Sequence, residues 1–203
     1  MFEILGGSPA CLYTGADPRA ELLLVPGQQL ACSKGLEVLA VGSGERIEEG
    51  LSIGATVTEV LRHRGLCIVP WGFGKWWFQR GELVREILRS NDLPETFFLG
   101  DTRWRALPAP APPLLREAED QGIGILSGTD PLPFRWQQRV VGSYGCWIEG
   151  ALNRDDPFPN VVELLQRGTP HRTIFGRTAR LAASAVHQVL MQFQKRLRGR
   201  TRS

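Results

Sequence analysis

Three segments of the chain place basic, acidic and aromatic side chains directly after an apolar run. They read WGFGKWWFQRG (71–81), DTRW (101–104) and SGTDPLPF (127–134). In the first, Lys75 stands among tryptophans, where its ammonium could be held over ring faces or directed at an anionic group. It could equally extend into solvent while the tryptophans close one end of the core. These segments are the first candidates for a binding or catalytic site.

Asp101 and Asp130 follow their apolar runs in similar contexts, L-G-D and S-G-T-D. Two carboxylates on one cleft could bind a metal, orient a base, or act as acid and base. Each could instead cap the next turn or pair with Arg103 or Arg135. We take Asp130, Lys75 and Asp101 as the candidate catalytic residues, and the distance between the two carboxylates decides between these alternatives.

The candidate ligand-binding residues combine two cations, a hydroxyl and an indole. They are Trp71, Lys75, Arg103 and Thr129. Such a mixture suits a small anionic or phosphorylated ligand, because guanidinium and ammonium groups donate charge-assisted hydrogen bonds to oxyanions.

Several common kinds of site are absent from the sequence. The four cysteines form no C-x-x-C pair, so we expect no zinc site and no cofactor. His63, His171 and His187 do not follow the apolar runs that carry the candidate residues. A Ser-His-Asp arrangement would need His171 to reach Ser127, and Ser127 does not stand in a G-x-S-x-G motif. No G-x-G-x-x-G or phosphate-binding loop motif supports a nucleotide site.

Apolar runs and amphipathic stretches alternate along the chain. Strands are predicted at 21–27, 36–44, 66–70, 96–101, 123–128 and 144–150. Helices are predicted at 52–64, 81–90, after the proline-rich connector 105–113, at 160–168 and at 178–197. Strands separated by about ten helical residues indicate parallel β-α-β units. The fold class is therefore α/β with a parallel sheet, whose strand ends bring the three segments to one rim.

Length and charge set the domain organisation. A chain of 203 residues with 42% hydrophobic residues can bury one core, so residues 1–203 are expected to form a single domain. The net charge of +3 is concentrated in a basic tail, KRLRGRTRS (195–203). Such a tail could touch a polyanion, but it also suits a helix C-terminus, and nucleic-acid binding is not expected. The sequence has no signal peptide and no run long enough for a membrane span, which predicts a cytoplasmic protein.

One family resemblance rests on four successive segments. LLLVPGQQLACSKGLEVLAVG, GLCIVPWGFGKWW, FFLGD and GIGILSGTDPLP, within residues 22–150, resemble the polymerase-and-histidinol-phosphatase (PHP) type of metal-dependent hydrolase. The similarity is greatest to an uncharacterised bacterial branch with W-G-F-G-K-W and G-T-D-P-L-P loops. It implies an incomplete (β/α) barrel and hydrolysis of a phosphoester, with Asp130 as base or weak metal ligand and with Lys75 and Arg103 stabilising negative charge.

The chain departs from the PHP pattern at the metal ligands. Gln28 stands near a usual glutamate, Trp71 near a usual histidine and Pro131 in place of another histidine, while Asp130 matches the family's aspartate. No H-x-H segment is present. Amide and indole groups bind transition metals poorly, so no metal is expected unless an upstream segment supplies ligands.

Two functional explanations remain open. The chain is either a shortened hydrolase, or a binding or scaffold protein that has lost the chemistry and dimerises through a sheet edge left exposed by the missing strands.

Overall fold

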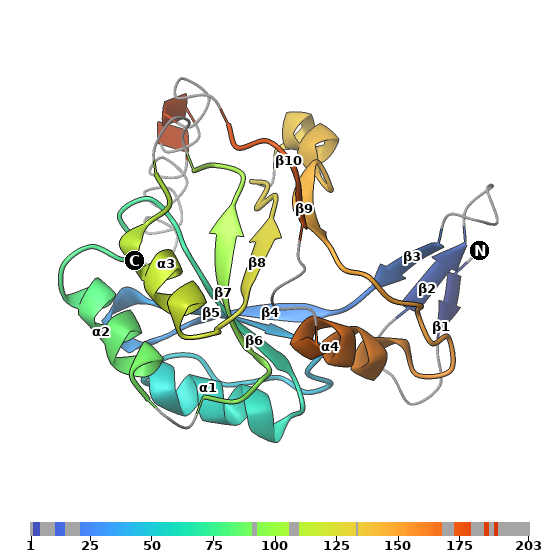
Figure 1. Ribbon diagram of the computed structural model, residues 1–203, viewed down its shortest axis with the longest axis horizontal. Coiled ribbons are helices and arrows are strands. Elements are labelled where there is room, and N and C mark those ends of the chain that lie inside the picture. Colours follow the sequence, from blue (N-terminus) through green and yellow to red (C-terminus); the bar gives the residue numbers. More distant parts are fainter. Residues whose placement is uncertain are drawn as a thin grey trace, which may run out of the picture.

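A five-stranded mixed sheet forms the centre of the computed structural model (Figure 1). The structure describes residues 2–4, 11–14, 21–90, 93–105, 110–132, 134–167, 173–179, 185–186 and 189–190. The strands lie side by side in chain order: β4 (Gly27–Ala31), β5 (Glu37–Val41), β6 (Leu66–Pro70), β7 (Phe97–Thr102) and β8 (Ile125–Gly128).

The prediction of an all-parallel sheet in an incomplete barrel is wrong. Only β6, β7 and β8 run parallel, whereas β4 pairs antiparallel with β5 and β5 pairs antiparallel with β6. In the described part of the chain the sheet stays open, with β4 and β8 at its edges.

The cause of the antiparallel β5–β6 pair is the segment between β5 and α1 (Ile53–Arg62). This segment runs back along β4, because the Gly50 N–H donates to Ala31 O (2.7 Å) and the Ser33 N–H donates to Leu51 O (2.7 Å). The helix α1 then returns the chain to the end where β5 finished, so Leu66 pairs with Val41. Two successive strands run parallel when the connection between them runs the length of the strands once. Here the connection runs that length twice, first along β4 and then as α1, so β6 starts where β5 ends.

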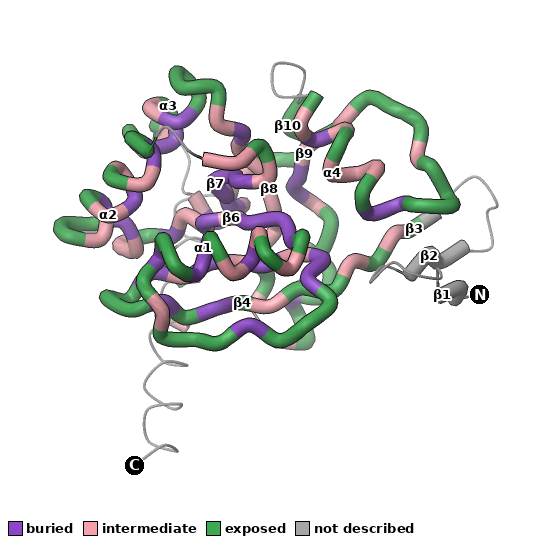
Figure 2. Tube along the Cα trace, turned by 90° about the horizontal axis from the view of Figure 1, so that it is seen from below, coloured by how far each residue is buried: buried purple, intermediate pink, exposed green. Residues whose placement is uncertain are grey.

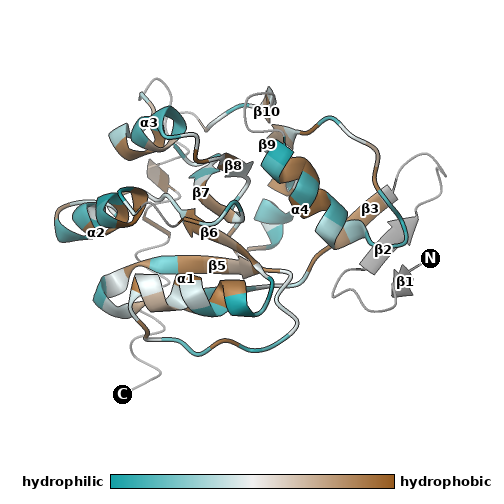
Figure 3. Cartoon of the chain, turned by 60° about the horizontal axis from the view of Figure 1, so that its bottom comes forward, coloured by the Kyte–Doolittle hydropathy of each residue, from teal (hydrophilic) through white to brown (hydrophobic). Residues whose placement is uncertain are grey.

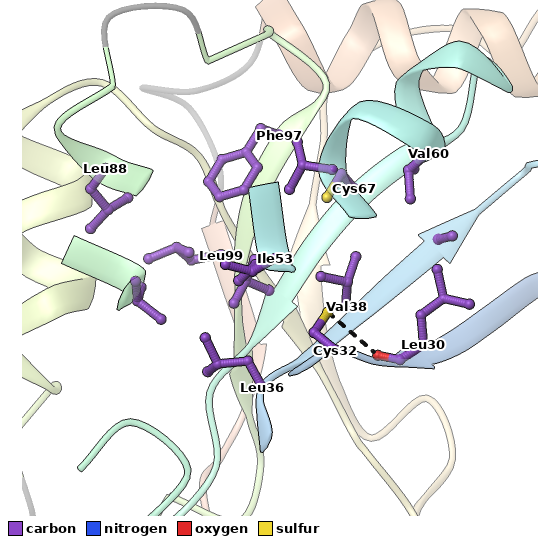
Figure 4. Close-up of a cluster of buried hydrophobic side chains, with 14 of the residues drawn as sticks. Leu30, Cys32, Leu36, Val38, Ile53, Val60, Cys67, Leu88, Phe97 and Leu99 are labelled. Carbon is purple, nitrogen blue, oxygen red and sulfur yellow. Dashed lines mark hydrogen bonds between the residues drawn. The ribbon is translucent and has the colours of Figure 1, made fainter. Parts of the chain in front are cut away.

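Three helices cover one face of the sheet. They are α1, α2 (Gln79–Leu88) and α3 (Pro113–Asp120), and all three contribute to the larger hydrophobic cluster. Figure 4 shows side chains from α1, α2 and β4–β7 gathered in it, among them Ile53, Leu88 and Leu99. The buried stretches of the strands and the inner sides of these helices face each other in Figure 2. This layer contains the core of the molecule.

The other face of the sheet is covered by α4 (Pro157–Arg167). Phe158 and Leu165 of this helix join Leu66 and Phe98 in a second hydrophobic cluster. Neighbouring residues of β7 belong to different clusters, because successive side chains of a strand point to opposite faces. In Figure 3 the strands β5 and β6 are largely hydrophobic, while α2 and α3 are mixed, as expected for strands between two layers.

Two smaller sheets flank the central one. Strands β1 (Phe2–Ile4), β2 (Cys11–Thr14) and β3 (Glu21–Leu24) form an antiparallel sheet that extends from the body in Figure 1. Strand β9 (Tyr144–Trp147) pairs antiparallel with β10 (Thr173–Gly176). The strand predicted at 21–27 covers β3 and only the first residue of β4. Strands β1, β2 and β10 and the rest of β4 were not predicted.

Most predicted elements are confirmed. Helix α1 begins after Ser52, whose hydroxyl accepts from the Ala55 N–H (3.2 Å). Helix α4 begins at Pro157, three residues before the predicted start. Of the helix predicted at 178–197, residues 185–186 and 189–190 are helical, and most of the rest, like the basic tail 195–203, lies outside the described residues. None of the described helices is long and apolar enough to span a bilayer.

The edge strand β4 bears on the predicted dimer. At Ala31 the N–H donates to the Glu49 carboxylate (3.4 Å) and the carbonyl accepts from Gly50. The chain itself thus occupies part of this edge, and dimerisation through it stays a prediction.

Candidate ligand-binding site

A cavity of about 200 Å³ lies beside the C-terminal ends of the three parallel strands. Leu39, Ile68 and Leu126 come from β5, β6 and β8 and supply apolar side chains to its wall. The polar and aromatic lining residues are Gln29, Trp71, Lys75, Asp101, Thr102, Ser127 and Asp130. Four of the six sequence-predicted site residues, Trp71, Lys75, Asp101 and Asp130, therefore line one hollow.

Lys75 is held by a tight turn and an ion pair. Its N–H donates to Gly72 O (2.9 Å), and Arg80 supports the turn by donating to Gly74 O (2.7 Å). The Lys75 ammonium lies 2.5 Å from a carboxylate oxygen of Glu37 on β5. Both side chains are largely buried, so the lysine charge is neutralised within the wall of the cavity.

Gln29 shares the same carboxylate. Its side-chain amide donates to Glu37 Oε2 (2.9 Å). Glu37 therefore accepts from two neighbours, and would keep a hydrogen bond if Lys75 turned toward a ligand.

Asp101 forms a buried ion pair. Only 4% of its side chain is exposed, and Arg105 donates to both carboxylate oxygens, Nε to Oδ1 (3.1 Å) and Nη2 to Oδ2 (2.9 Å). The Tyr144 hydroxyl donates to Oδ2 (2.9 Å) and the Thr102 N–H to Oδ1 (2.9 Å). The alternative expected from the sequence, pairing with Arg103, is replaced by pairing with Arg105. A carboxylate bound by four donors is a structural anchor for the rim.

The neighbours of Asp101 have shifted pKa values. The hydrogen bond to Asp101 raises the pKa of the Arg105 guanidinium. Burial, followed by the charge of Asp101, raises the pKa of the Tyr144 hydroxyl, and the nearby Ser127 hydroxyl opposes this. Tyr144 therefore stays protonated and can keep donating to the carboxylate.

Asp130 lies at the mouth of the cavity in a different environment. Its backbone has a φ of 42° and its carbonyl accepts from the Trp104 indole N–H (2.9 Å). The residue is exposed, and its carboxylate has no hydrogen-bond or ion-pair partner among the described residues. Asp and Asn tolerate a left-handed backbone better than most residues, which suits this position.

Ser127 adds a buried hydroxyl to the lining, near the Tyr144 hydroxyl. Its Oγ is buried, and no partner in the described part of the chain meets it with full hydrogen-bond geometry. A buried hydroxyl without a partner carries a desolvation cost, which a ligand that bonds to it would relieve.

The other two predicted residues are not in the lining. Arg103 donates from Nη1 to Ser143 Oγ (3.2 Å) and to Arg177 O (3.2 Å), and so ties the end of β7 to the region of β9 and β10. Thr129 stands between Gly128 and Asp130 but does not line the hollow. Arg103 is thus committed to structural contacts.

Four polar residues of this region were missed by sequence reasoning. Gln29 and Glu37 arrive through the antiparallel strands β4 and β5, and Tyr144 arrives from β9. Only Arg105 had a local indication, since it follows Asp101 by four residues in the same segment. Contacts between distant segments leave no such pattern.

The described residues contain no group of three or more His, Cys, Asp or Glu side chains that could hold a metal. His63 caps the C-terminus of α1 near Glu45 and Glu59 and does not line the cavity. The predicted alternative that joins Ser127 to His171 lies outside the described residues.

A scan against protein-family models found no match. A search of curated proteins also found none. Resemblance to the PHP hydrolases therefore stays a sequence-based prediction. The incomplete barrel that this resemblance implied is contradicted by the mixed, open sheet.

Proposed function

We propose that this chain binds a small polar molecule with a cationic or hydrogen-bond-donating group in the cavity at the ends of β6, β7 and β8. The observation that carries this proposal is the Asp130 carboxylate at the mouth of the hollow, which has no partner among the described residues, whereas the lining cation Lys75 is already paired with Glu37. Ligands of α/β sheets usually bind beyond the C-terminal ends of parallel strands, which agrees with this place.

Charge favours a cationic group over an anionic one. Lys75 is paired with Glu37 and Arg105 with Asp101, so these four charges cancel. Among the described lining residues Asp130 is then the one charge without an opposite partner, and it attracts a cation and repels an anion across a few ångströms. Ser127 supplies a hydroxyl that can accept from an amine or a hydroxyl of the ligand.

The volume of the cavity restricts the size of the ligand. The cavity of about 200 Å³ is smaller than the roughly 300–1,000 Å³ typical of drug-sized ligand pockets. Its apolar wall of Leu39, Ile68 and Leu126 suits a short hydrocarbon or ring, with Trp71 available to face a cation. A small amine is the class that fits these features best.

A binding panel tests the proposal. Ethanolamine, choline and phenethylamine are titrated into the chain by calorimetry, alongside inorganic phosphate and phosphoethanolamine. We expect an amine to bind and Asp130→Asn to weaken it by about tenfold, the effect of losing one charge-assisted contact. Thr129→Ser is the matched control, since Thr129 adjoins Asp130 outside the cavity lining. An amine affinity unchanged in Asp130→Asn would overturn the assignment.

A phosphorylated ligand is the second candidate, favoured by one contact. Because Gln29 also donates to Glu37, Lys75 could leave its ion pair and bind a phosphate without stripping that carboxylate of all donors. In the same panel this candidate predicts phosphoethanolamine binding that Lys75→Met abolishes and Asp130→Asn strengthens. Release of inorganic phosphate would support the phosphoester hydrolase implied by the PHP resemblance.

The described cysteines Cys32, Cys67 and Cys146 are free thiols. They support the cytoplasmic location that we infer, because reduced thiols persist there.

A further inference from the structure

An exposed group of aromatic rings follows β6 and precedes α2. Phe73, Trp77 and Phe78 are 56%, 53% and 88% exposed. Their rings contact one another edge to face, with centroids 4.9 Å apart for Phe73–Trp77 and 6.5 Å apart for Trp77–Phe78. We call these three residues the aromatic shelf.

The backbone of the aromatic shelf is strained at Phe78. Phe78 has a φ of 55°, a conformation that bulky residues rarely adopt. It immediately precedes α2, and its carbonyl accepts from the Gly81 N–H (3.0 Å). Strain of this kind commonly occurs at functional positions, so the exposed ring calls for an explanation.

A groove of about 250 Å³ runs from the shelf to α3. Its lining residues are Trp71, Trp76, Trp77, Phe78, Gly81, Glu82, Arg85, Pro112, Pro113 and Leu114. The two charged lining residues pair with each other, because Arg85 donates to Glu82 (2.6 Å), and Arg85 also donates to Glu117 (2.9 Å) outside the lining. The lining of the groove therefore carries no net charge and is otherwise made of indole rings, prolines and other apolar groups.

Trp76, one of the lining residues of this groove, has an unused hydrogen-bond donor. The residue is 7% exposed, and its indole N–H is buried without an acceptor among the described residues. Buried indole N–H groups usually find a partner, and a missing one costs about 1–3 kcal/mol. A carbonyl that enters the groove would supply the acceptor.

Two prolines of the chain itself line the groove beside the tryptophan rings. Pro112 has φ −54° and ψ 140°, close to the polyproline II conformation. Pro112 and Pro113 line the groove together with the three tryptophans. Proline rings in this extended form are thus already accommodated beside the indoles.

We propose that the groove between the aromatic shelf and Pro112–Pro113 docks a proline-rich peptide in the polyproline II conformation. This peptide has a fixed backbone and no internal hydrogen bonds, so its carbonyls are free to accept from an indole N–H. Aromatic-lined grooves recognise such segments in general by packing proline rings between aromatic side chains. The neutral charge of the groove agrees with an uncharged occupant.

The test is a titration with a labelled synthetic peptide of repeated Pro-Ala-Pro units, followed by fluorescence anisotropy. A peptide of the same length with serine in place of proline is the matched probe. We expect the proline peptide alone to bind, and the Trp76 indole N–H resonance to move in a proton–nitrogen correlation spectrum.

Three variants separate the contributions. Phe78→Ala removes part of the shelf and is expected to weaken binding by about tenfold, whereas Trp76→Phe keeps a ring, loses the donor and is expected to cost about threefold to tenfold. Trp136→Ala removes another exposed indole, which lies against Phe134 away from the groove, and should change nothing.

Some outcomes overturn the proposal. Equal binding of the two peptides would do so, as would binding that survives Phe78→Ala and Trp76→Phe together in a folded protein. Binding of a linear glucose oligosaccharide but not of the proline peptide would assign the shelf to sugar instead. Circular dichroism of each variant verifies that the chain is folded.

Discussion

At the scale of single residues, Asp101 and Asp130 perform different tasks although both line one cavity, Asp101 from the end of β7 and Asp130 from just after β8. Changing Asp101 to Asn removes the charge that Arg105 and the Tyr144 hydroxyl surround. We expect this change to lower the free energy of unfolding by about 2–4 kcal/mol, because it leaves the largely buried Arg105 guanidinium with a neutral partner in place of a carboxylate.

The matched control is Asp130→Asn, which makes the same chemical change at an exposed carboxylate. Its expected effect on the free energy of unfolding is within about 0.5 kcal/mol, since Asn also tolerates the left-handed backbone. Urea unfolding of both variants, followed by far-ultraviolet circular dichroism, measures the difference. Similar losses in the two variants would contradict the division of roles.

The positions of these residues could be predicted from the sequence, but their hydrogen-bond and ion-pair partners could not. The strand ends of β6, β7 and β8 were predictable from apolar runs, and so was the meeting of Lys75, Asp101 and Asp130 at one rim. Their partners were not, because Glu37 and Tyr144 lie 38 and 43 residues away from the groups that they bind. Without these partners Lys75 looked free to bind an anion.

At the scale of elements, the first turn of α2 is packed directly against the loop that precedes it. A Cβ built on Gly81 would lie 2.4 Å from Trp76 O, well inside contact distance. Gly81→Ala is therefore expected to lower the free energy of unfolding by about 1–3 kcal/mol, despite the better helix propensity of alanine.

Gly54 in α1 provides the comparison, because a Cβ there meets nothing within 4 Å. Gly54→Ala should raise the free energy of unfolding by up to about 1 kcal/mol. Chemical denaturation of both variants measures the two effects, and the same sign for both would show that the Trp76 carbonyl can move out of the way.

The arrangement of strands is the part of the fold that element patterns could not predict. Strands β5 to β8 of the central sheet were anticipated, and so was the α/β class, whereas the edge strand β4 was not. The direction of β5 relative to β6 depends on the return of residues 42–52 along β4, which rests on backbone hydrogen bonds such as Gly50 to Ala31. Backbone groups are alike in every residue, so this path has no counterpart in the apolar pattern.

At the scale of the whole molecule, the two hydrophobic clusters share one sheet, and this predicts that they unfold together. Phe158 on α4 is 5% exposed and packs in the second cluster, while Cys67 on β6 is fully buried in the first. Phe158→Ala should lower the free energy of unfolding by about 3–5 kcal/mol through lost burial and a cavity. If the sheet unfolds as a unit, the free energy of the opening that exposes the Cys67 thiol to a labelling reagent should fall by the same amount, although Cys67 lies on the opposite face.

Thiol labelling at mildly alkaline pH measures this coupling. Burial raises the pKa of the Cys67 thiol from 9.0 to about 12, so the folded protein reacts there only by opening, while the unfolded chain reacts readily. We expect Phe158→Ala to accelerate Cys67 labelling by about a hundredfold or more, the factor that corresponds to the fall in the free energy of unfolding measured with urea. Cys146, which is partly exposed on β9, should react at a similar rate in both proteins. An unchanged Cys67 rate beside a large loss in urea would mean that α4 detaches alone and that the sheet with its three helices is a separate cooperative unit.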